Sequence, residues 1–422
     1  QAYLKGAIGL IAVQTQGYAE IDPRALNAQD IAGPEYAPAF SLSRQDASYL
    51  KELLCPEDPA VSHPSSVAVE LNASSWVERN RPAYNITGYL PGTAASEGDD
   101  RMILLSAHYD SYFDGFQDDN CAVSMTFGII KALIDSGYQP RYTIAVCALA
   151  AEEWGVCDSK FDWSTGAWNQ VFRVHPEWQG RVIADLNFEL PAHAHNTQDA
   201  IRSTYESADF LKHFCENITV PKEAYPDGLT VLAPIETWSD YHSQYDNEEF
   251  YQEAVYRFHH ELYTRLLVTL DQLTLPPLDF SRHFLAMKSS VADCLAAQSN
   301  APAEVLEEIP ALLESISKVC ESADLLYEKI QEINNHTVSA DFPMVSGLSS
   351  KLLHIFRKMQ DYFVRLDWQD AVCFPHAAAS QNLCHLEQAV HALESQNITA
   401  ALEALYEVDN NCYAFLFDEE VY

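Results

Sequence analysis

The chain alternates short, mostly apolar runs with longer segments in which apolar residues recur every three or four positions. The apolar runs at residues 101–109, 142–151 and 181–190 have the length and composition of buried β-strands. Residues 121–137 and 255–273 have the helical period, and each segment is closed by a Gly or Pro stop signal. This alternation predicts an α/β fold with a mainly parallel, twisted sheet that helices flank on both faces.

The helix predicted at residues 121–137 has its larger apolar side chains at steps of three and four. Val123, Phe127, Ile130 and Leu133 share one face in this spacing. This spacing, followed by Gly137, predicts a helix over the segment.

The chain before this core has shorter apolar runs separated by turn signals. Residues 1–62 predict short strands, a long loop and a helix that begins at Ser43, with Asp46 completing an approximate capping box. Residues 67–75 and 84–92 predict two more strands, the second closed by a Pro-Gly turn. We expect a small β-rich domain at residues 1–62.

The last part of the chain, residues 278–422, has the helical period throughout. Apolar residues recur at steps of three and four in residues 303–333, 351–366 and 383–405. A helical bundle that packs on the catalytic domain or on a second subunit explains this pattern. With residues 63–277 as the catalytic unit, the chain is predicted to have three domains.

Charge narrows the range of partners. The 422 residues include 61 Asp and Glu against 25 Lys and Arg, so the formal net charge is 25 − 61 = −36. Such a surface repels nucleic acids and anionic membranes. The longest apolar runs are much shorter than the roughly 20 residues that a spanning helix needs, so no membrane span is predicted.

The ten cysteines form no CxxC pair, which argues against a cysteine zinc site. Their apolar surroundings resemble those of buried free thiols, which slightly favours a cytoplasmic location. Five N-x-S/T sequons leave secretion open. Because Gln1 is not a natural start, we expect the sequence to begin inside a longer chain.

Possible metal ligands follow each predicted strand of the core. Taken alone, a His-x-Asp is usually a surface turn, a Glu-Glu pair a solvated helix start and an Asp at a strand end a cap. Two adjacent carboxylates directly after an apolar strand are costly to desolvate unless cations or donors meet them. Because the carboxyl ends of parallel strands meet at one edge of a sheet, the clusters together predict a metal site. Its candidate members are His108, Asp110, Asp118, Asp119, Glu152, Glu153, Asp185 and His242.

The ligand types indicate which metal is bound. Imidazole nitrogen with several carboxylate oxygens and no thiolate suits catalytic zinc, with manganese or cobalt as alternatives. A shared carboxylate can hold two ions about 3.5–4 Å apart, and a further carboxylate can then take a proton from water.

The stretches SAHYDS, DDNCA, AAEEWG, IADLNFE and YHSQYD together resemble the M28 family of co-catalytic metallopeptidases. Residues 1–62 resemble the protease-associated domain inserted in many members. The C-terminal helices resemble the dimerisation domain of the branch that contains glutamate carboxypeptidase II and the transferrin receptor, so the resemblance implies a homodimer.

The family pattern implies two zinc ions and a role for each matched residue. It also implies a cis peptide bond between Asp118 and Asp119. The implied roles are His108 and Asp185 on one metal, Glu153 and His242 on the other, Asp118 as the bridge, Glu152 as general base, Asp110 as support for the His108 site and Tyr241 as a donor to the oxyanion. Relatives have a longer stretch before the Tyr-His pair. Either this loop is deleted between Asp240 and Tyr241, or the sequence omits its residues, and we favour omission.

The substrate pocket is less well defined by the sequence. Trp154, Phe188 and Glu189 adjoin the predicted ligands and are candidate pocket residues, although core packing or capping explains them equally well. A carboxylate-rich site suits the positive N-terminus of a peptide, so we favour an aminopeptidase. A carboxypeptidase would need Arg or Lys for the terminal carboxylate. A non-catalytic receptor-like scaffold would be expected to lack ligands, and a single-zinc cyclase-like transferase would not need both metal sets.

Overall fold

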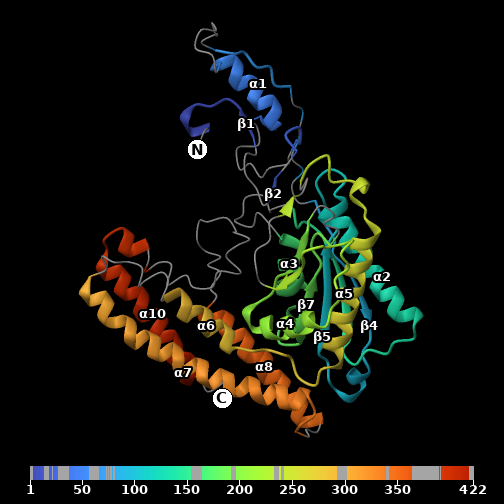
Figure 1. The fold of residues 1–422 in the computed structure, drawn as a ribbon, viewed down its shortest axis with the longest axis vertical. Helices are drawn as coiled ribbons and strands as arrows, with labels where there is room; N and C mark the ends of the chain where they lie inside the picture. Colours follow the sequence, from blue (N-terminus) through green and yellow to red (C-terminus); the bar gives the residue numbers. More distant parts are fainter. Residues whose placement is uncertain are drawn as a thin grey trace.

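The fold is described from a computed structural model (Figure 1). It describes residues 3–13, 19–20, 22–26, 38–56, 66–72, 74, 76, 78, 81–153, 164–191, 196–231, 237–238, 242–291, 302–338, 342–363, 389 and 391–417. The sheet and its helices form the middle of the molecule, between the N-terminal strands and the long C-terminal helices.

The central sheet has four strands in the order β4-β6-β5-β7. They are β4 (Ile86–Leu90), β5 (Met102–His108), β6 (Thr143–Leu149) and β7 (Val182–Asn187). Strands β5, β6 and β7 are parallel, and β4 runs antiparallel to β6 at one edge. The prediction of a mainly parallel sheet is therefore confirmed, and the sequence segments assigned to its strands are correct.

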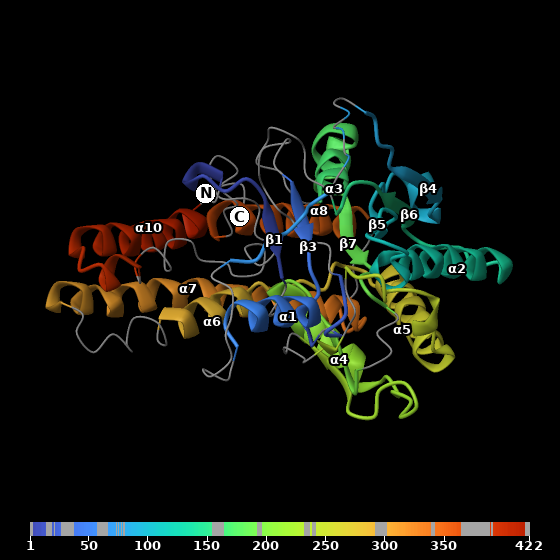
Figure 2. The same cartoon turned by 90° about the horizontal axis from the view of Figure 1, so that it is seen from above.

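Helices cover both faces of this sheet, as its apolar strands require. Ile103 and Leu105 of β5 pack in one core cluster with residues of α2 (Cys121–Asp135) and α5 (Glu253–Gln272). The alternating residues Met102 and Leu104 pack on the opposite face, near Ala167 of α3 (Thr165–Asn169) and Trp178. Figure 2 shows α3 on one side of the sheet and α5 on the other.

Helix α2 turns most of its predicted apolar face toward the core. Leu133 is buried, and Val123 and Ile130 are partly buried and pack against the same core cluster, whereas Phe127 is 49% exposed. Ala122, Met125 and Ile129 are also fully buried, so the buried stripe is wider than the predicted one.

Residues 1–62 supply two short parallel strand pairs and a helix. β1 (Leu10–Ala12) pairs with β3 (Ala39–Ser41), and β2 (Ala19–Glu20) pairs with β10 (Thr237–Trp238) of the core. α1 (Arg44–Leu54) begins after Ser43, whose Oγ accepts a hydrogen bond from the Asp46 backbone N–H at 3.0 Å. This confirms the predicted helix start. Residues 66–72 form no strand, contrary to the prediction for that segment.

The remaining elements of the core region come between β7 and α5 in the sequence. β8 (Gln198–Ile201) and β9 (Gly228–Val231) form a small parallel sheet beside α4 (Ala208–Glu216). Short helical turns complete the chain: Tyr3–Lys5, Thr93–Glu97, Phe116–Asn120, Gln170–Val174, Pro176–Trp178, Tyr205–Ser207 and Glu248–Phe250.

The C-terminal region is helical, as predicted. It contains α6 (Ser281–Ser290), α7 (Ala303–Asn334), α8 (Phe342–Phe363) and α10 (Ile398–Phe417). The helix predicted over residues 383–405 differs, because the chain turns at Gln396 and α10 starts after Asn397.

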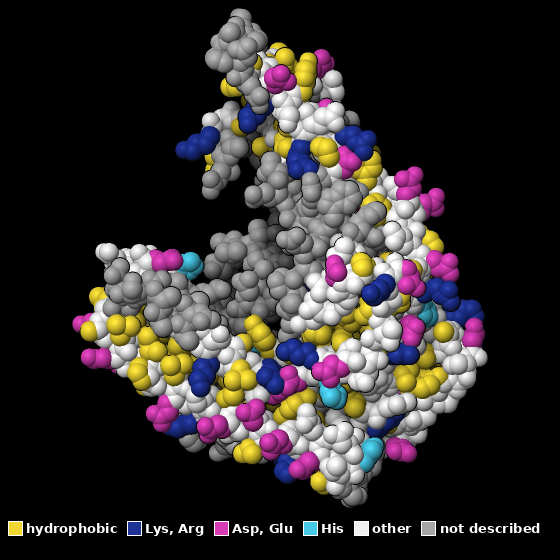
Figure 3. Space-filling model, in the orientation of Figure 1, with side chains coloured by type: hydrophobic (Ala, Val, Ile, Leu, Met, Phe, Trp, Pro, Cys, Tyr) yellow, Lys and Arg dark blue, Asp and Glu magenta, His cyan; other side chains and the backbone are white. Residues whose placement is uncertain are grey.

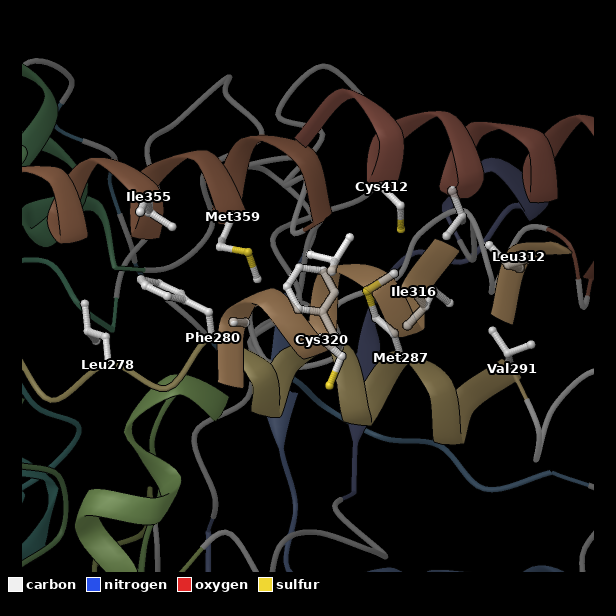
Figure 4. Close-up of a cluster of buried hydrophobic side chains, with 14 of the residues drawn as sticks. Leu278, Phe280, Met287, Val291, Leu312, Ile316, Cys320, Ile355, Met359 and Cys412 are labelled. Carbon is white, nitrogen blue, oxygen red and sulfur yellow. The ribbon is translucent and has the colours of Figure 1, made fainter. Parts of the chain in front are cut away.

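The C-terminal helices share a core of their own. Phe280, Met287, Ile316, Met359 and Cys412 point into its centre from different segments (Figure 4). The backbone N–H of Asp279 donates to the Glu206 carbonyl at 2.8 Å, which ties this region to the sheet domain.

Charged side chains of both signs are interspersed over the face drawn in Figure 3. Among the described residues, no helix is long and apolar enough to span a lipid bilayer.

Candidate metal centre

The predicted ligands from β5 and β6 meet at the carboxyl edge of the sheet. His108 is the last residue of β5 and lies opposite Leu149, the last residue of β6. Glu152 and Glu153 follow Leu149 after two alanines. Because the two strands are parallel and in register, these polar side chains leave the sheet on the same side.

Asp118 lies at the centre of the cluster, between two imidazoles. Its Oδ1 is 2.9 Å from Nε2 of His108, and its Oδ2 is 3.0 Å from Nε2 of His242. The same His242 nitrogen is 3.0 Å from Oε1 of Glu153. His108, Asp118, Glu153 and His242 are all buried. One carboxylate placed between two imidazoles is the arrangement that a bridging ligand requires.

Among the described residues, three overlapping groups of side chains could each hold a metal ion, since one ligand atom from every member lies within 4.8 Å of the others. These groups are His108 with Asp118 and Glu189, His108 with Glu152 and Glu153, and Asp118 with Glu153 and His242.

Asp110 orients this cluster through both its backbone and its side chain. Its carbonyl oxygen lies 2.8 Å from Nδ1 of His108. Because a carbonyl only accepts, the proton sits on Nδ1 and Nε2 faces the cluster. Its two carboxylate oxygens accept the backbone N–H groups of Glu152 and Glu153, each at 3.1 Å.

Asp246 is a site residue that sequence reasoning missed. It is 1% exposed, and its carboxylate accepts the backbone N–H groups of Gln117 at 2.8 Å and Asp118 at 3.1 Å. The peptide bond between Asp118 and Asp119 is cis, as the family resemblance implies. The only sequence signal for Asp246 is its place four residues after His242 in the YHSQYD stretch.

Asp185 does not lie with the other predicted ligands. The register pairs it with Leu104, and its Oδ1 accepts a hydrogen bond from Ser106 Oγ at 2.8 Å. Leu104 is four residues before His108, or about 13 Å along the strand. Asp185 is also in none of the groups that could hold a metal. The structure therefore corrects its predicted position.

Glu189, and not Asp185, is the carboxylate that lies beside His108. Ser106 pairs with Asn187, so the same register continued by two residues reaches His108 and Glu189. Oε1 of Glu189 is 3.8 Å from Nε2 of His108, and the Glu189 side chain is 42% exposed. It was predicted only as a pocket residue.

Phe188 is not a pocket residue, because its side chain is completely buried. It packs edge-on against Tyr263, with ring centroids 4.2 Å apart, in the core beneath the site. Trp154 and Tyr241 lie outside the described residues.

Burial and ion pairing shift the pKa values of the side chains in the cluster. Burial raises the pKa of Glu152 to about 8 and that of Glu153 to about 7. Burial also opposes ionisation of Asp118, but its hydrogen bonds to His108 and His242 outweigh this and hold its pKa well below the usual range. His242 has its pKa lowered by burial, yet Asp118 and Glu153 raise it overall to about 9.

A divalent cation fits this donor set. Oε2 of Glu153 and Oδ2 of Asp119 are buried, and neither has a hydrogen-bond donor among the described residues. Buried carboxylates without donors are unfavourable unless a positive charge meets them. Imidazole nitrogens and carboxylate oxygens are ligands that zinc prefers in catalytic sites.

An α/β sheet that gathers buried imidazoles and carboxylates at its carboxyl edge offers the kind of ligands that divalent cations bind. Residues 85–222 match the model of peptidase family M28. The match includes His108, Asp118, Glu153 and Glu189. It does not extend over residues 1–62 or 278–422, so the protease-associated and dimerisation-like domains stay predictions.

Several solved structures are similar to this chain. A peptidase M28 precursor from Shewanella amazonensis SB2B is 16% identical, with a TM-score of 0.45, over 63% of this chain and 61% of that one. A zinc aminopeptidase from Bacillus subtilis is 15% identical, with a TM-score of 0.36, over 45% of this chain and 50% of that one. LapB from Legionella pneumophila is 14% identical, with a TM-score of 0.32, over 43% of this chain and 54% of that one. No curated protein matches the chain.

Proposed function

We propose that the protein is a two-metal exopeptidase that hydrolyses peptides from their amino end. The position of Asp118 between two imidazoles carries this proposal, because it places one carboxylate within reach of two ions. In this proposal His108 and Glu189 hold one ion, His242 and Glu153 hold the other, and Asp118 serves both. The groups that could hold a metal support this assignment, which replaces Asp185 with Glu189.

Two zinc ions held there, or manganese or cobalt ions, would lower the pKa of water and polarise the peptide carbonyl. The protein's own residues orient the reaction. Asp110 and Asp246 fix the ligands from behind, and the partly exposed Glu189 borders the side from which substrate enters.

Glu152 is the proposed proton carrier. Its carboxylate is half-buried, receives a hydrogen bond from Ser164 Oγ at 3.0 Å and lies beside His108 and Glu153. Bound cations would lower its raised pKa, so the carboxylate could accept a proton from water near neutral pH. It would then return that proton to the leaving amine. Tyr241, next to His242, stays a proposed donor to the oxyanion.

The charge of the site supports an aminopeptidase. Among the described residues, the carboxylates of Asp118, Glu153 and Glu189 pair with His108 or His242 and with no Lys or Arg. A negative site attracts the ammonium group at the start of a peptide and repels a terminal carboxylate.

One observation favours a carboxypeptidase as the second candidate. The Arg24 guanidinium lies 5.6 Å from the ring centroid of Tyr245, three residues after His242. A residue of the first region therefore lies close to the loop that carries a ligand. Arg24 already pairs with Asp22 at 2.7 Å, which reduces its availability for a substrate carboxylate.

An activity comparison tests the choice. The zinc-loaded protein is assayed on a panel of aminoacyl-nitroanilides and, in parallel, on N-acylated dipeptides, with chelator-treated protein as control. We expect metal-dependent release of nitroaniline and little hydrolysis of the blocked peptides. Hydrolysis of only the blocked peptides would establish the carboxypeptidase. No hydrolysis of either by protein shown to hold two ions would support the non-catalytic scaffold.

A further inference from the structure

The loop that carries His242 is held from outside the M28 match, by the first region. β2 pairs with β10, so Ala19 lies opposite Thr237 and Glu20 opposite Trp238. Two residues after His242, the side-chain amide of Gln244 reaches the same region. Its Oε1 accepts the backbone N–H of Leu26 at 2.8 Å, and its Nε2 donates to the Arg24 carbonyl at 3.3 Å.

The segment that receives Gln244 is itself anchored. Arg24 is fixed by two hydrogen bonds from its guanidinium to Asp22, at 3.0 and 2.7 Å. The Pro23 carbonyl accepts the backbone N–H of Gln45, at the start of α1, at 2.8 Å. A continuous set of contacts therefore runs from α1 through residues 22–26 to Gln244. We call residues 22–26 the anchor turn.

His242 needs such support because of its backbone conformation. Its φ is +56°, in the left-handed region that residues other than glycine rarely adopt. A residue in this region persists only where its surroundings hold it there. Asp246 ties the loop to Asp118 on one side, and Gln244 ties it to the anchor turn on the other.

We propose that Gln244 is a positioning residue through which the first region holds His242 in the metal centre. This inference rests on the proposed function, since it assigns His242 to one of two metal sites. If Gln244 has this role, the anchor turn helps to position a ligand of that metal site. Loss of the Gln244 amide then weakens the ion held by His242 and Glu153 more than the ion held by His108.

Cobalt titration of the metal-free protein tests this inference. Absorption bands of bound Co²⁺ report each ion as it enters, without any substrate. In Gln244→Ala we expect the ion held by His242 and Glu153 to bind about tenfold more weakly, with the affinity for the ion held by His108 unchanged. Gln179→Ala removes another side-chain amide that donates to a backbone carbonyl, at 3.3 Å from Val171, and serves as the matched control.

A conservative variant separates positioning from general stability. Gln244→Glu keeps an oxygen that accepts the Leu26 N–H, so we expect it to recover most of the lost affinity. Wild-type protein that binds no Co²⁺ would overturn the proposed function. Wild-type protein that binds two ions, together with a Gln244→Ala variant that binds them equally well, would overturn only the role of Gln244. Equal weakening of both ions in Gln244→Ala would overturn it as well.

Discussion

The side chain of Asp246 accepts the backbone N–H of Asp118, which lies 128 positions earlier in the chain. A second bond, from the backbone N–H of Gln117, completes a two-point contact between the loop of His242 and the loop of the bridging carboxylate. Two proposed ligands from distant parts of the chain are thus held in one geometry by Asp246, which is in none of the possible metal-holding groups among the described residues.

Replacement of this carboxylate should loosen the metal centre. In Asp246→Asn one oxygen is replaced by an NH₂ group, which cannot accept the N–H that it faces. We expect zinc affinity to fall by about 10- to 100-fold, as for other residues that orient ligands. Isothermal titration with zinc measures the change, and Asp114→Asn, which changes an exposed acid in the loop of Asp118, is the control. Unchanged zinc affinity in Asp246→Asn would refute this role.

Asp185 and Glu189 should differ sharply in their effect on bound metal. Asp185→Asn keeps an oxygen for the Ser106 hydroxyl, so we expect both ions to remain. Glu189→Gln removes a charged ligand beside His108, so we expect the loss of one ion after dialysis against a weak chelator. Elemental analysis of the two purified variants gives the stoichiometry. The reverse result would restore Asp185 as the ligand.

Glu152→Gln should separate metal binding from chemistry. The amide retains the size of the side chain and an oxygen for the Ser164 hydroxyl, but it cannot take a proton from water. We expect two bound ions and a kcat lower by about 10²- to 10⁴-fold, with little change in KM. Steady-state kinetics on the best nitroanilide measure this. Turnover near that of the wild type would show that another group is the base.

Phe188→Ala tests the correction from pocket to core. Removal of a completely buried ring leaves a cavity, which costs about 3–5 kcal/mol of unfolding free energy. Urea unfolding of the chelated protein measures this loss. We expect KM to change far less than it would for a residue that contacts substrate. A large rise in KM without loss of stability would return Phe188 to the pocket.

The strand ends could be predicted because apolar runs of β5 and β6 stop where His108 and Glu152 begin. The choice between Asp185 and Glu189 could not be predicted. Asp185 lies within β7 and Glu189 lies two residues beyond its end, and only the register with β5 shows which one reaches the edge. Phe188 lies between two outward positions, so alternation alone could have placed it in the core.

Contacts between distant segments left no local pattern. Asp246 is bonded to backbone N–H groups, and any residue type except proline at positions 117 and 118 would supply them. The contact of Gln244 with the anchor turn likewise involves backbone atoms of Arg24 and Leu26. Neither residue could be singled out by type or spacing, because a side chain bonded to a distant backbone depends on how the loops fold together.

The protonation of the metal-free centre links stability to pH. The pKa of Glu152 rises from 4.5 to about 8, and that of Glu153 from 4.5 to about 7, chiefly through burial. His242, despite its burial, is raised from 6.5 to about 9 by Asp118 and Glu153. Between the unfolded and folded pKa values, each group keeps its proton in the folded protein but has lost it in the unfolded chain. The folded state therefore binds more protons, and its stability falls as pH rises.

Thermal unfolding in chelator should show this fall directly, with a melting temperature that decreases from pH 6 to pH 8. Zinc should reverse it, because the ion displaces the protons of Glu153 and His242 and binds their unprotonated forms more tightly as pH rises. We therefore expect the zinc-induced increase in melting temperature to be larger at pH 8 than at pH 6. The pKa of Asp118 is lowered, so this residue makes the folded state more stable as pH rises. That change occurs below the ordinary carboxyl pKa and therefore does not affect the melting temperature between pH 6 and pH 8. A chelated protein that melts at the same or a higher temperature at pH 8 would show that the cluster does not hold these protons.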